Sequence, residues 1–355
     1  MKRHTYTFLI MIAVVLLGSC DAVSNSGGEA SVHEPLVLPD VHDPAQLVRV
    51  GDALHLYASP VEWWAYNLDD RDWYFLGDDL YEGNNPDWDL GDAAYWAPSI
   101  VQVAEDRYRL YHSAVYDEAN HGSRIGFARG AVADGEIAWA PVDDYVIESD
   151  GYNQPFAIDP AVFADDEGRH WLVYGSHAAG IWIVEIDPDS GFLAERPWDK
   201  RWRADDDRFT HLADYGGNRH DENNIEAAYI YNHPGNEFYY LFVNWDRCCS
   251  GPESTYNIRI GRSDSPTGPY LDRDGRPLSD GGGSLFLDRS GEILGDSRFV
   301  GPGHAGIYRH VNGSYYFSHH FYDAASGGTP SLALWNLTWV DGWPQIDRGR
   351  PVELE

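Results

Sequence analysis

Apolar and polar positions alternate along this chain in short runs, and one such pattern recurs five times. Each copy contains a short strand, a turn rich in Gly, Asp or Asn, and a second strand rich in Tyr, Phe and Leu. The copies begin at His42, Trp96, Ile158, Ile225 and Gly303. Alternation with a period of two is typical of half-buried strands. Repeats of roughly 50 to 80 residues built from short strands predict a radial array, the β-propeller.

The segments between the copies supply the remaining strands. Four alternating apolar segments begin at Ser123, Gly180, Tyr256 and Leu332, at distances suited to the third strand of a blade. Convincing helical periodicity is absent from the sequence, so we expect little helix. Residues 76–92 and 196–223 are rich in Asp, Asn, Gly and Arg and predict long loops, which often build binding surfaces. Residues 34–355 are therefore expected to form one all-β domain.

The N-terminal residues have the pattern of a targeting segment and are excluded from the predicted fold. Residues 1–19 begin with MKRH, continue with FLIMIAVVLL, which is too short for a permanent membrane span, and end in LGS before Cys20. The run LGSC resembles a bacterial lipobox, which implies that Cys20 is acylated and that residues 20–33 form a flexible tether. An ordinary secretory signal cleaved nearby is the alternative. We expect an exported protein, lipid-anchored to the cell envelope through Cys20.

The charge of the chain limits its partners. The formal net charge is −32, and lysine occurs only at Lys2 and Lys200. Without a basic track to neutralise phosphates, the chain is not expected to bind nucleic acid. An anionic polymer would be repelled at low ionic strength, whereas a neutral glycan is compatible with this charge. Aromatic residues make up 14% of the chain, and most of them are expected to pack between the sheets.

Besides Cys20, the chain has two cysteines, Cys248 and Cys249, which are adjacent. This spacing is wrong for a zinc site. In an exported protein the pair can form a vicinal disulfide or remain as buried thiols, and both alternatives stay open. The surrounding sequence does not indicate a thiolate nucleophile.

One position of the aligned repeat contains the candidate catalytic residues. Aligned on the hairpin, the column reads Asp43, Ala97, Asp159, Glu226 and His304. Because one column of a propeller repeat lies on one ring around the axis, three acids and an imidazole are predicted to lie close together. Neighbouring carboxylates cannot all ionise comfortably, so their pKa values should be pushed apart, as acid and base duties require. The alternative is that these segments are only turns at strand starts, which three acids in one column disfavour.

The motifs HDP, WAP, AIDP, IEA and GPGH, in this order, occur together with WDRCC and STYNIRIGRSDSPTGPYLDRDG. Over residues 37–347 this series resembles family-43 glycoside hydrolases, and most of all their endo-1,5-α-L-arabinanases. The resemblance implies a five-bladed propeller that cleaves α-1,5-linked L-arabinan in endo fashion with inversion of configuration. It also implies a neutral plant polysaccharide or arabino-oligosaccharides as the partner, a monomer, and no organic cofactor.

The resemblance implies a role for each acid. Asp43 matches the general base that activates water, Glu226 matches the general acid, and Asp159 matches the third carboxylate, which tunes the acid and holds the sugar. Inversion requires about 6.5–9.5 Å between base and acid, which leaves room for the water. His304 matches a histidine that faces a calcium ion in the central channel, where waters would supply most of the ligands. A hydrogen-bonded channel histidine without a metal is the alternative.

Sugar contacts are predicted at three further positions. Trp96 can stack on a furanose ring, although a core tryptophan is the alternative. Ser176 and His177 match a segment that lines the cleft in the family. The residue after the serine is usually aromatic there, so His177 is a departure. Phe156 is another, since it replaces the usual Asn before AIDP.

Three other functions remain as alternatives. The same scaffold can carry an exo-acting arabinanase, an α-L-arabinofuranosidase or a β-xylosidase. A non-catalytic glycan-binding surface lipoprotein is disfavoured, because binding a neutral sugar does not require a base, an acid and a tuning carboxylate together. A structural, metal-stabilised propeller would have no sugar specificity.

Overall fold

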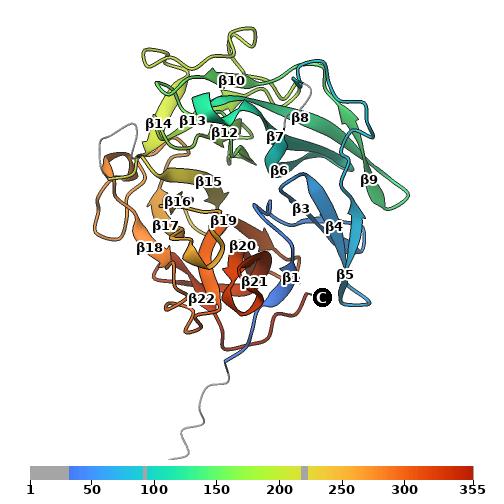
Figure 1. Ribbon diagram of the computed structural model, residues 1–355, viewed down its shortest axis with the longest axis vertical. Helices are drawn as coiled ribbons and strands as arrows, with labels where there is room; N and C mark the ends of the chain where they lie inside the picture. The colour runs from blue at the N-terminus through green and yellow to red at the C-terminus, as the bar shows by residue number, and fades with distance from the viewer. Residues whose placement is uncertain (1–31, 91–93, 217–222, 355) are drawn as a thin grey trace, which may run out of the picture. The chain divides into compact units, whose positions relative to one another are not determined.

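The computed structural model describes residues 32–90, 94–216 and 223–354, and it confirms a five-bladed β-propeller. Figure 1 shows the five antiparallel sheets arranged in chain order around a central axis. The first blade consists of β2 (Val48–Val50), β3 (Ala53–Ala58), β4 (Glu62–Asn67) and β5 (Asp72–Gly77). The second consists of β6 (Ala94–Ala104), β7 (Arg107–Asp117), β8 (Gly122–Ala133), β9 (Glu136–Pro141) and β10 (Ile147–Asp150).

The remaining blades repeat the same order. The third contains β11 (Ala161–Ala164), β12 (His170–Tyr174), β13 (Ile181–Ile186) and β14 (Phe209–Ala213). The fourth contains β15 (Ile225–Asn232), β16 (Tyr239–Trp245), β17 (Asn257–Ser263) and β18 (Ser284–Leu287). The fifth contains β19 (Phe299–Arg309), β20 (Tyr315–Asp323), β21 (Thr329–Val340) and β22 (Trp343–Asp347). The four predicted third strands correspond to β8, β13, β17 and β21.

An N-terminal strand closes the ring. Strand β1 (Leu36–Pro39) pairs antiparallel with β21, and Leu36 lies opposite Leu334. In Figure 1 this blue strand lies beside the red strands of the last blade. The closure brings the start of the first repeat next to the end of the fifth, so residues nearly 280 positions apart can share a site.

The core lies between neighbouring blades, as the aromatic content predicts. Phe242 of the fourth blade and Phe317 of the fifth have ring centroids 5.7 Å apart, and both rings are fully buried. Helix is scarce in the described residues, where only four three-residue 3-10 turns occur: Glu118–Asn120, Gly251–Glu253, Leu278–Asp280 and Ala324–Ser326. No helix in this part of the chain is long and apolar enough to cross a membrane.

One predicted loop is wrong in part. Residues 196–223 contain β14 (Phe209–Ala213), because Phe209, Leu212 and Ala213 are apolar enough to pack against the third blade. Strand β5 also extends to Gly77, inside the loop predicted for residues 76–92. The predicted signal segment, residues 1–19, and Cys20 lie outside the described residues, as does most of the tether.

Candidate active site

Each repeat places one residue in a left-handed backbone conformation on the ring around the axis. The φ angles are 46° at Asp43, 47° at Ala97, 55° at Asp159, 52° at Ala227 and 56° at His304. Non-glycine residues rarely adopt this conformation, so its fivefold recurrence marks a built feature. The predicted column is therefore wrong by one residue in the fourth blade. Glu226 precedes the ring residue, at the position that His42 and Trp96 occupy in their repeats.

The backbone N–H of each ring residue is held by a side chain. In four junctions the acceptor belongs to the preceding blade: Ser59 Oγ for Ala97 (2.7 Å), Ser113 Oγ for Asp159 (3.1 Å), Asn244 Oδ1 for His304 (3.2 Å) and His320 Nδ1 for Asp43 (3.1 Å). In the remaining junction the acceptor is a ring carboxylate, because Ala227 donates to Asp159 Oδ2 at 3.0 Å. The ring thus fixes the backbone beneath each candidate functional group.

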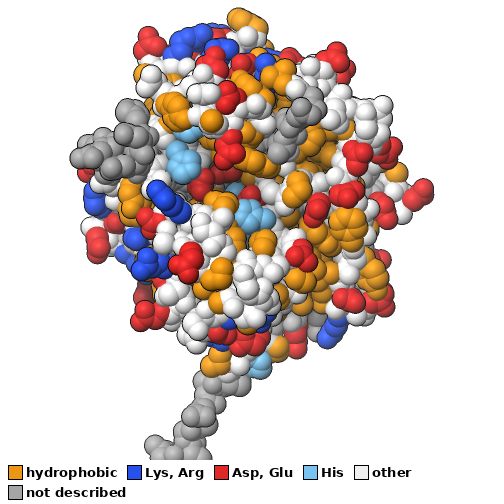
Figure 2. Space-filling model, viewed as in Figure 1, with side chains coloured by type: hydrophobic (Ala, Val, Ile, Leu, Met, Phe, Trp, Pro, Cys, Tyr) orange, Lys and Arg blue, Asp and Glu red, His pale blue; other side chains and the backbone are white. Residues whose placement is uncertain are grey.

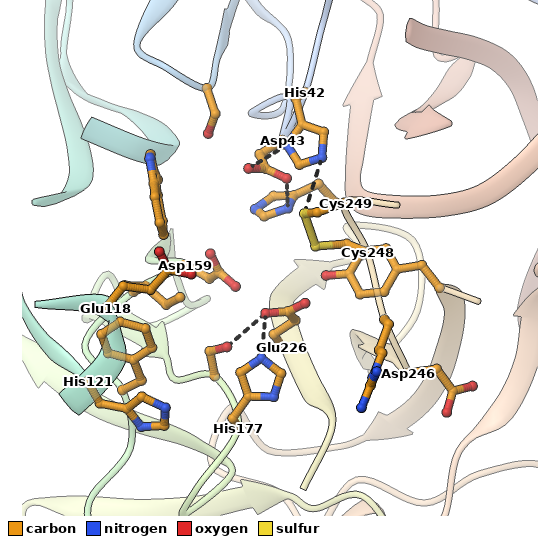
Figure 3. A pocket seen from close by; sticks show the side chains of 18 of the residues that line it. His42, Asp43, Glu118, His121, Asp159, His177, Glu226, Asp246, Cys248 and Cys249 are labelled. Carbon is orange, nitrogen blue, oxygen red and sulfur yellow. Dashed lines mark hydrogen bonds and ion pairs between the residues drawn. A yellow bond between two sulfur atoms is a disulfide. The ribbon is translucent and has the colours of Figure 1, made fainter. Parts of the chain in front are cut away.

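All seven predicted site residues line one cavity of about 660 Å³. They are Asp43, Trp96, Asp159, Ser176, His177, Glu226 and His304. Figure 2 shows a hollow at the centre of one face, with carboxylates and imidazoles gathered in it. Figure 3 shows the acids on different sides of this cavity, each on its own blade. Residues that lie far apart in the sequence are thus brought together in one site.

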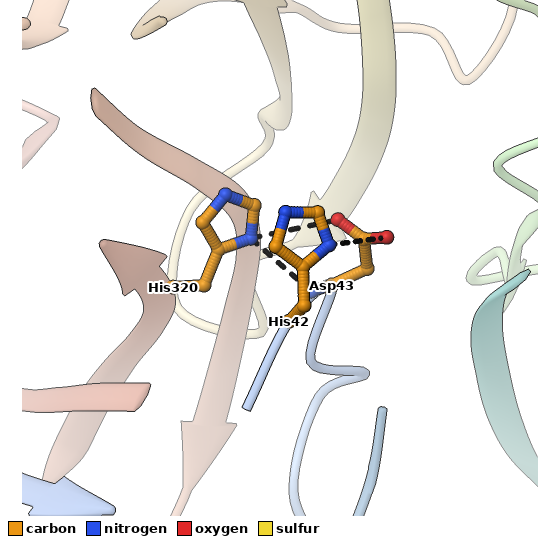
Figure 4. A group of neighbouring side chains, drawn as sticks. All are labelled: His42, Asp43 and His320. Atoms are coloured by element: carbon orange, nitrogen blue, oxygen red, sulfur yellow. Dashed lines mark hydrogen bonds and ion pairs between the residues drawn. The ribbon is translucent and has the colours of Figure 1, made fainter. Parts of the chain in front are cut away.

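Asp43 is surrounded by three imidazoles, and Figure 4 shows two of them, those of His42 and His320. Its Oδ2 lies 2.9 Å from His42 Nδ1, and its Oδ1 lies 3.0 Å from His304 Nδ1 and 3.5 Å from His320 Nδ1. Burial alone would raise the pKa of Asp43, but His42 and His304 outweigh it and hold that pKa well below its usual range. The carboxylate is therefore ionised, as a general base must be. The sequence analysis missed His42 and His320; the only signal was the histidine in the HDP motif.

Asp43 acts on these imidazoles in turn. Burial opposes protonation of His304, yet the Asp43 carboxylate raises the pKa of His304 to about 9. The same carboxylate raises the pKa of His42 against the effect of burial. For His320, burial and the neighbouring His42 hold the pKa well below the usual value. His320 is thus neutral, consistent with its Nδ1 accepting the Asp43 N–H.

The ligand atoms of His42, Asp43 and His320 lie within 4.8 Å of one another, a spacing that a metal ion can also use. Their lone pairs, however, are already engaged. His320 Nδ1 accepts from the Asp43 N–H at 3.1 Å, and His42 Nδ1 faces the Asp43 carboxylate. The arrangement is accounted for by hydrogen bonds that hold the carboxylate.

Asp159 has an opposite environment. It is 7% exposed and accepts a hydrogen bond from the N–H of Ala227. Burial raises the pKa of Asp159 to about 7, against His304, with further increases from Glu226 and Asp43. Asp159 is thus poised to exchange a proton near neutral pH, as the sequence analysis predicts for one of the acids.

Glu226 is held from the third blade. Its Oε2 accepts a hydrogen bond from Ser176 Oγ at 2.8 Å and lies 3.5 Å from His177 Nε2. Ser176 is fully buried, whereas the His177 side chain is 38% exposed. Ser176, predicted as a sugar contact, therefore has a partner within the protein.

Two apolar groups line the cavity, the Trp96 ring and the pair Cys248 and Cys249. Trp96 is half-buried and packs against Phe156 and Ile158, so it is both a core and a cavity residue. Cys248 and Cys249 form a disulfide, which decides between the two alternatives left by the sequence. Both cysteines line the cavity, and Cys249 Sγ lies 4.0 Å from His42 Nε2.

His304 also lines a second, smaller cavity along the axis. The residues around it include Gln46, Ser99 and Tyr229, and no carboxylate lines it among the described residues. Gln46 donates its amide to the Ile100 carbonyl, which leaves its own oxygen for another partner. The lining offers a cation one imidazole and a few oxygen-bearing side chains, so water would have to supply most of its ligands. This cavity of about 20 Å³ itself has room for about one water molecule.

Comparisons with known proteins agree with this geometry. The model of the family "Glycosyl hydrolases family 43" matches residues 33–344. The chain is 34% identical to the extracellular exo-alpha-(1->5)-L-arabinofuranosidase ArbA of Cellvibrio japonicus, over 87% of this chain and 86% of that protein. It is 35% identical to the extracellular endo-alpha-(1->5)-L-arabinanase 1 of Bacillus subtilis, over 70% and 68%. The Cellvibrio cellulosa alpha-L-arabinanase complexed with arabinohexaose superposes with a TM-score of 0.74 at 30% identity, covering 87% and 95%.

Proposed function

We propose, from the premise that this chain belongs to glycosyl hydrolase family 43, that it cleaves α-1,5-linked L-arabinan within the chain and inverts the anomeric configuration. Relatives named as arabinanases, one of them bound to arabinohexaose, support the choice of substrate. The observation that carries the proposal is the electrostatic asymmetry of the cavity: one carboxylate is held ionised by imidazoles, and the other two lie apart from it on neighbouring blades.

In the proposed mechanism Asp43 removes a proton from a water molecule as that water attacks the anomeric carbon. Glu226 gives its proton to the oxygen that leaves with the rest of the chain. The bond from water to the anomeric carbon forms while the glycosidic bond breaks, so the new hydroxyl lies on the opposite face of the sugar. Asp159 accepts the N–H of Ala227, the residue after Glu226, and in this proposal it is the third carboxylate, which tunes the acid and holds the sugar.

Substrate contacts and the metal complete the proposal. Trp96 offers a ring face for a furanose, while His177 and the disulfide lie on other walls of the cavity. We place a mostly water-coordinated calcium ion beside His304, where it would supply positive charge beneath the acids. Elemental analysis of the purified protein and an activity assay with EDTA test this ion.

Export through the N-terminal segment, with an acylated Cys20 as anchor, is also part of the proposal. The relatives named as extracellular support export. A neutral arabinan suits so acidic a protein, because no charge repulsion opposes its approach.

The deciding experiment is incubation with debranched arabinan, with products separated by size and the anomeric signals followed by NMR. Mixed oligomers with inverted configuration at early times support endo action. No release from arabinan or xylan would overturn the proposal. Release of a single short product from the chain end favours the exo alternative, for which the 34% identical relative is the specific support.

A further inference from the structure

Three hydrogen bonds connect the vicinal disulfide to Asp43. The Cys249 N–H donates to the Tyr322 hydroxyl at 2.7 Å, the Tyr322 hydroxyl lies 2.8 Å from His42 Nε2, and His42 Nδ1 lies 2.9 Å from Asp43 Oδ2. The four residues come from three blades that are adjacent in the closed ring, the fourth, the fifth and the first, and Figure 3 shows three of them, His42, Asp43 and Cys249. We call this series the disulfide relay.

The proton positions in the relay follow from donor chemistry. An ionised carboxylate can only accept, so His42 Nδ1 carries the hydrogen that faces Asp43. When His42 is neutral, its Nε2 accepts from the Tyr322 O–H, and when His42 is protonated, its Nε2–H donates to the Tyr322 oxygen. The Tyr322 oxygen is left to accept from the Cys249 N–H. In both states of His42 the contact between Nε2 and Tyr322 pairs a donor with an acceptor, and Tyr322 keeps a lone pair for the Cys249 N–H.

The surroundings restrain every member of the relay. The ring of His42 stacks on His320 with centroids 4.2 Å apart, and Tyr322 is only 3% exposed. Cys249 has a φ of 65°, a conformation that non-glycine residues rarely adopt, and its covalent bond to Cys248 restricts the peptide that carries its N–H. The relay therefore begins at a fixed amide.

We propose that Tyr322 and His42 are positioning residues for Asp43, and that the Cys248–Cys249 disulfide fixes the outer end of their hydrogen-bond series. The inference rests on the proposed role of Asp43 as general base. Loss of the relay should change how the Asp43 carboxylate is oriented toward the attacking water. It should not move the parts of the cavity wall that contact the sugar. Turnover should fall while KM stays nearly constant.

The first test is Tyr322→Phe, which removes one hydroxyl and keeps the ring. We expect kcat on debranched arabinan to fall about 10- to 100-fold, the usual cost of losing an orienting partner, with KM within about twofold of wild type. Tyr111→Phe is the matched control, because the buried Tyr111 hydroxyl donates to the Gly191 carbonyl at 3.0 Å, and Tyr111 does not line the cavity. That variant should keep wild-type kcat.

The second test reduces the disulfide with a phosphine, with thiol labelling to verify reduction and near-UV circular dichroism to verify folding. Reduction should lower kcat of wild type and Tyr111→Phe by about 10-fold. It should leave kcat of Tyr322→Phe unchanged, because the link to Asp43 is already broken there and effects in one series are not additive.

The outcomes separate the possible failures. A wild-type kcat for folded Tyr322→Phe overturns the relay, and so does an equal effect of reduction on both tyrosine variants. If Tyr322→Phe does not fold, the wild type decides: an unchanged kcat after verified reduction overturns the proposal. Turnover retained in Asp43→Ala would instead refute the proposed function itself.

Discussion

Asp43 and Asp159 occupy equivalent positions in the first and third blades, yet the structure gives them opposite properties. Both have left-handed backbones on the same ring, with φ of 46° and 55°, and both line the same cavity. Asp43 faces three imidazoles, whereas Asp159 accepts a hydrogen bond from the backbone N–H of Ala227. The pKa of Asp43 is held well below its usual range, and the pKa of Asp159 is raised to about 7.

The repeat fixes where each carboxylate lies, and the residues that surround it, from its own blade and from the next, fix its pKa. The ring aims both carboxylates into the cavity. The histidines at Asp43 come from the first and fifth blades, which pack against each other where the ring closes and β1 pairs with β21. Equivalent backbones can therefore hold carboxylates with opposite pKa shifts, as the proposed roles of base and tuning acid require.

The largest effect on activity should come from removing the proposed general base or the proposed general acid. Asp43→Ala and Glu226→Ala should each lower kcat by about 10²- to 10⁴-fold, the usual contribution of a general base or acid. Initial rates on debranched arabinan measure this loss, with circular dichroism to confirm folding. Asp52→Asn is the control, because the Asp52 side chain is 98% exposed and far from the cavity lining. Near-wild-type activity in either alanine variant would contradict the assigned roles.

The next prediction concerns the effect of the Asp159 charge on the free energy of unfolding. Its folded-state pKa of about 7 lies above the ordinary 3.8, so the folded protein binds more protons than the unfolded chain between these values. The free energy of unfolding should therefore decrease as the pH rises from about 4 to about 7. Asp159→Asn removes this charge, retains an acceptor for the Ala227 N–H and tolerates positive φ. At pH 8 it should be more stable than wild type by about 2–4 kcal/mol, given 1.36 kcal/mol per pKa unit.

Urea unfolding of both proteins at pH 4 and pH 8 measures the difference. The gain should nearly vanish at pH 4, where wild-type Asp159 is protonated. The same variant should lose turnover by about 10²-fold or more, since it no longer tunes Glu226. A variant less stable than wild type at pH 8 would show that the ionised Asp159 carboxylate does not destabilise the folded protein.

The sequence predicted the fold and the members of the site for physical reasons that are local. Strand alternation and turns repeat along the chain, and the ring residues inherit their placement from that repeat. The exact column was harder: Glu226 shares the cavity but precedes the ring residue Ala227, and the β15–β16 pairing shifts register between Glu226 and Tyr229. An alignment on residue type could not detect that shift.

The partners of the acids were not predictable in the same way. His320 and Tyr322 reach the first blade only through ring closure, across more than 275 residues. Nor does adjacency alone decide whether Cys248 and Cys249 are oxidised. These features depend on contacts between blades, which no local pattern records.

The smallest predicted effects test how Glu226 is held compared with Asp43. Glu226 has one close side-chain donor, Ser176 Oγ at 2.8 Å, and a longer contact with His177 at 3.5 Å. Loss of its donor leaves a buried acceptor unsatisfied at a cost of about 1–3 kcal/mol, so Ser176→Ala should lower kcat about 10- to 100-fold. A long, partly exposed contact contributes about 0–1 kcal/mol, so His177→Ala should lower kcat by no more than about fivefold. Steady-state kinetics of the two variants measure the ratio. Equal losses would mean that the long His177 contact shortens when sugar binds, and that Glu226, like Asp43, depends on an imidazole.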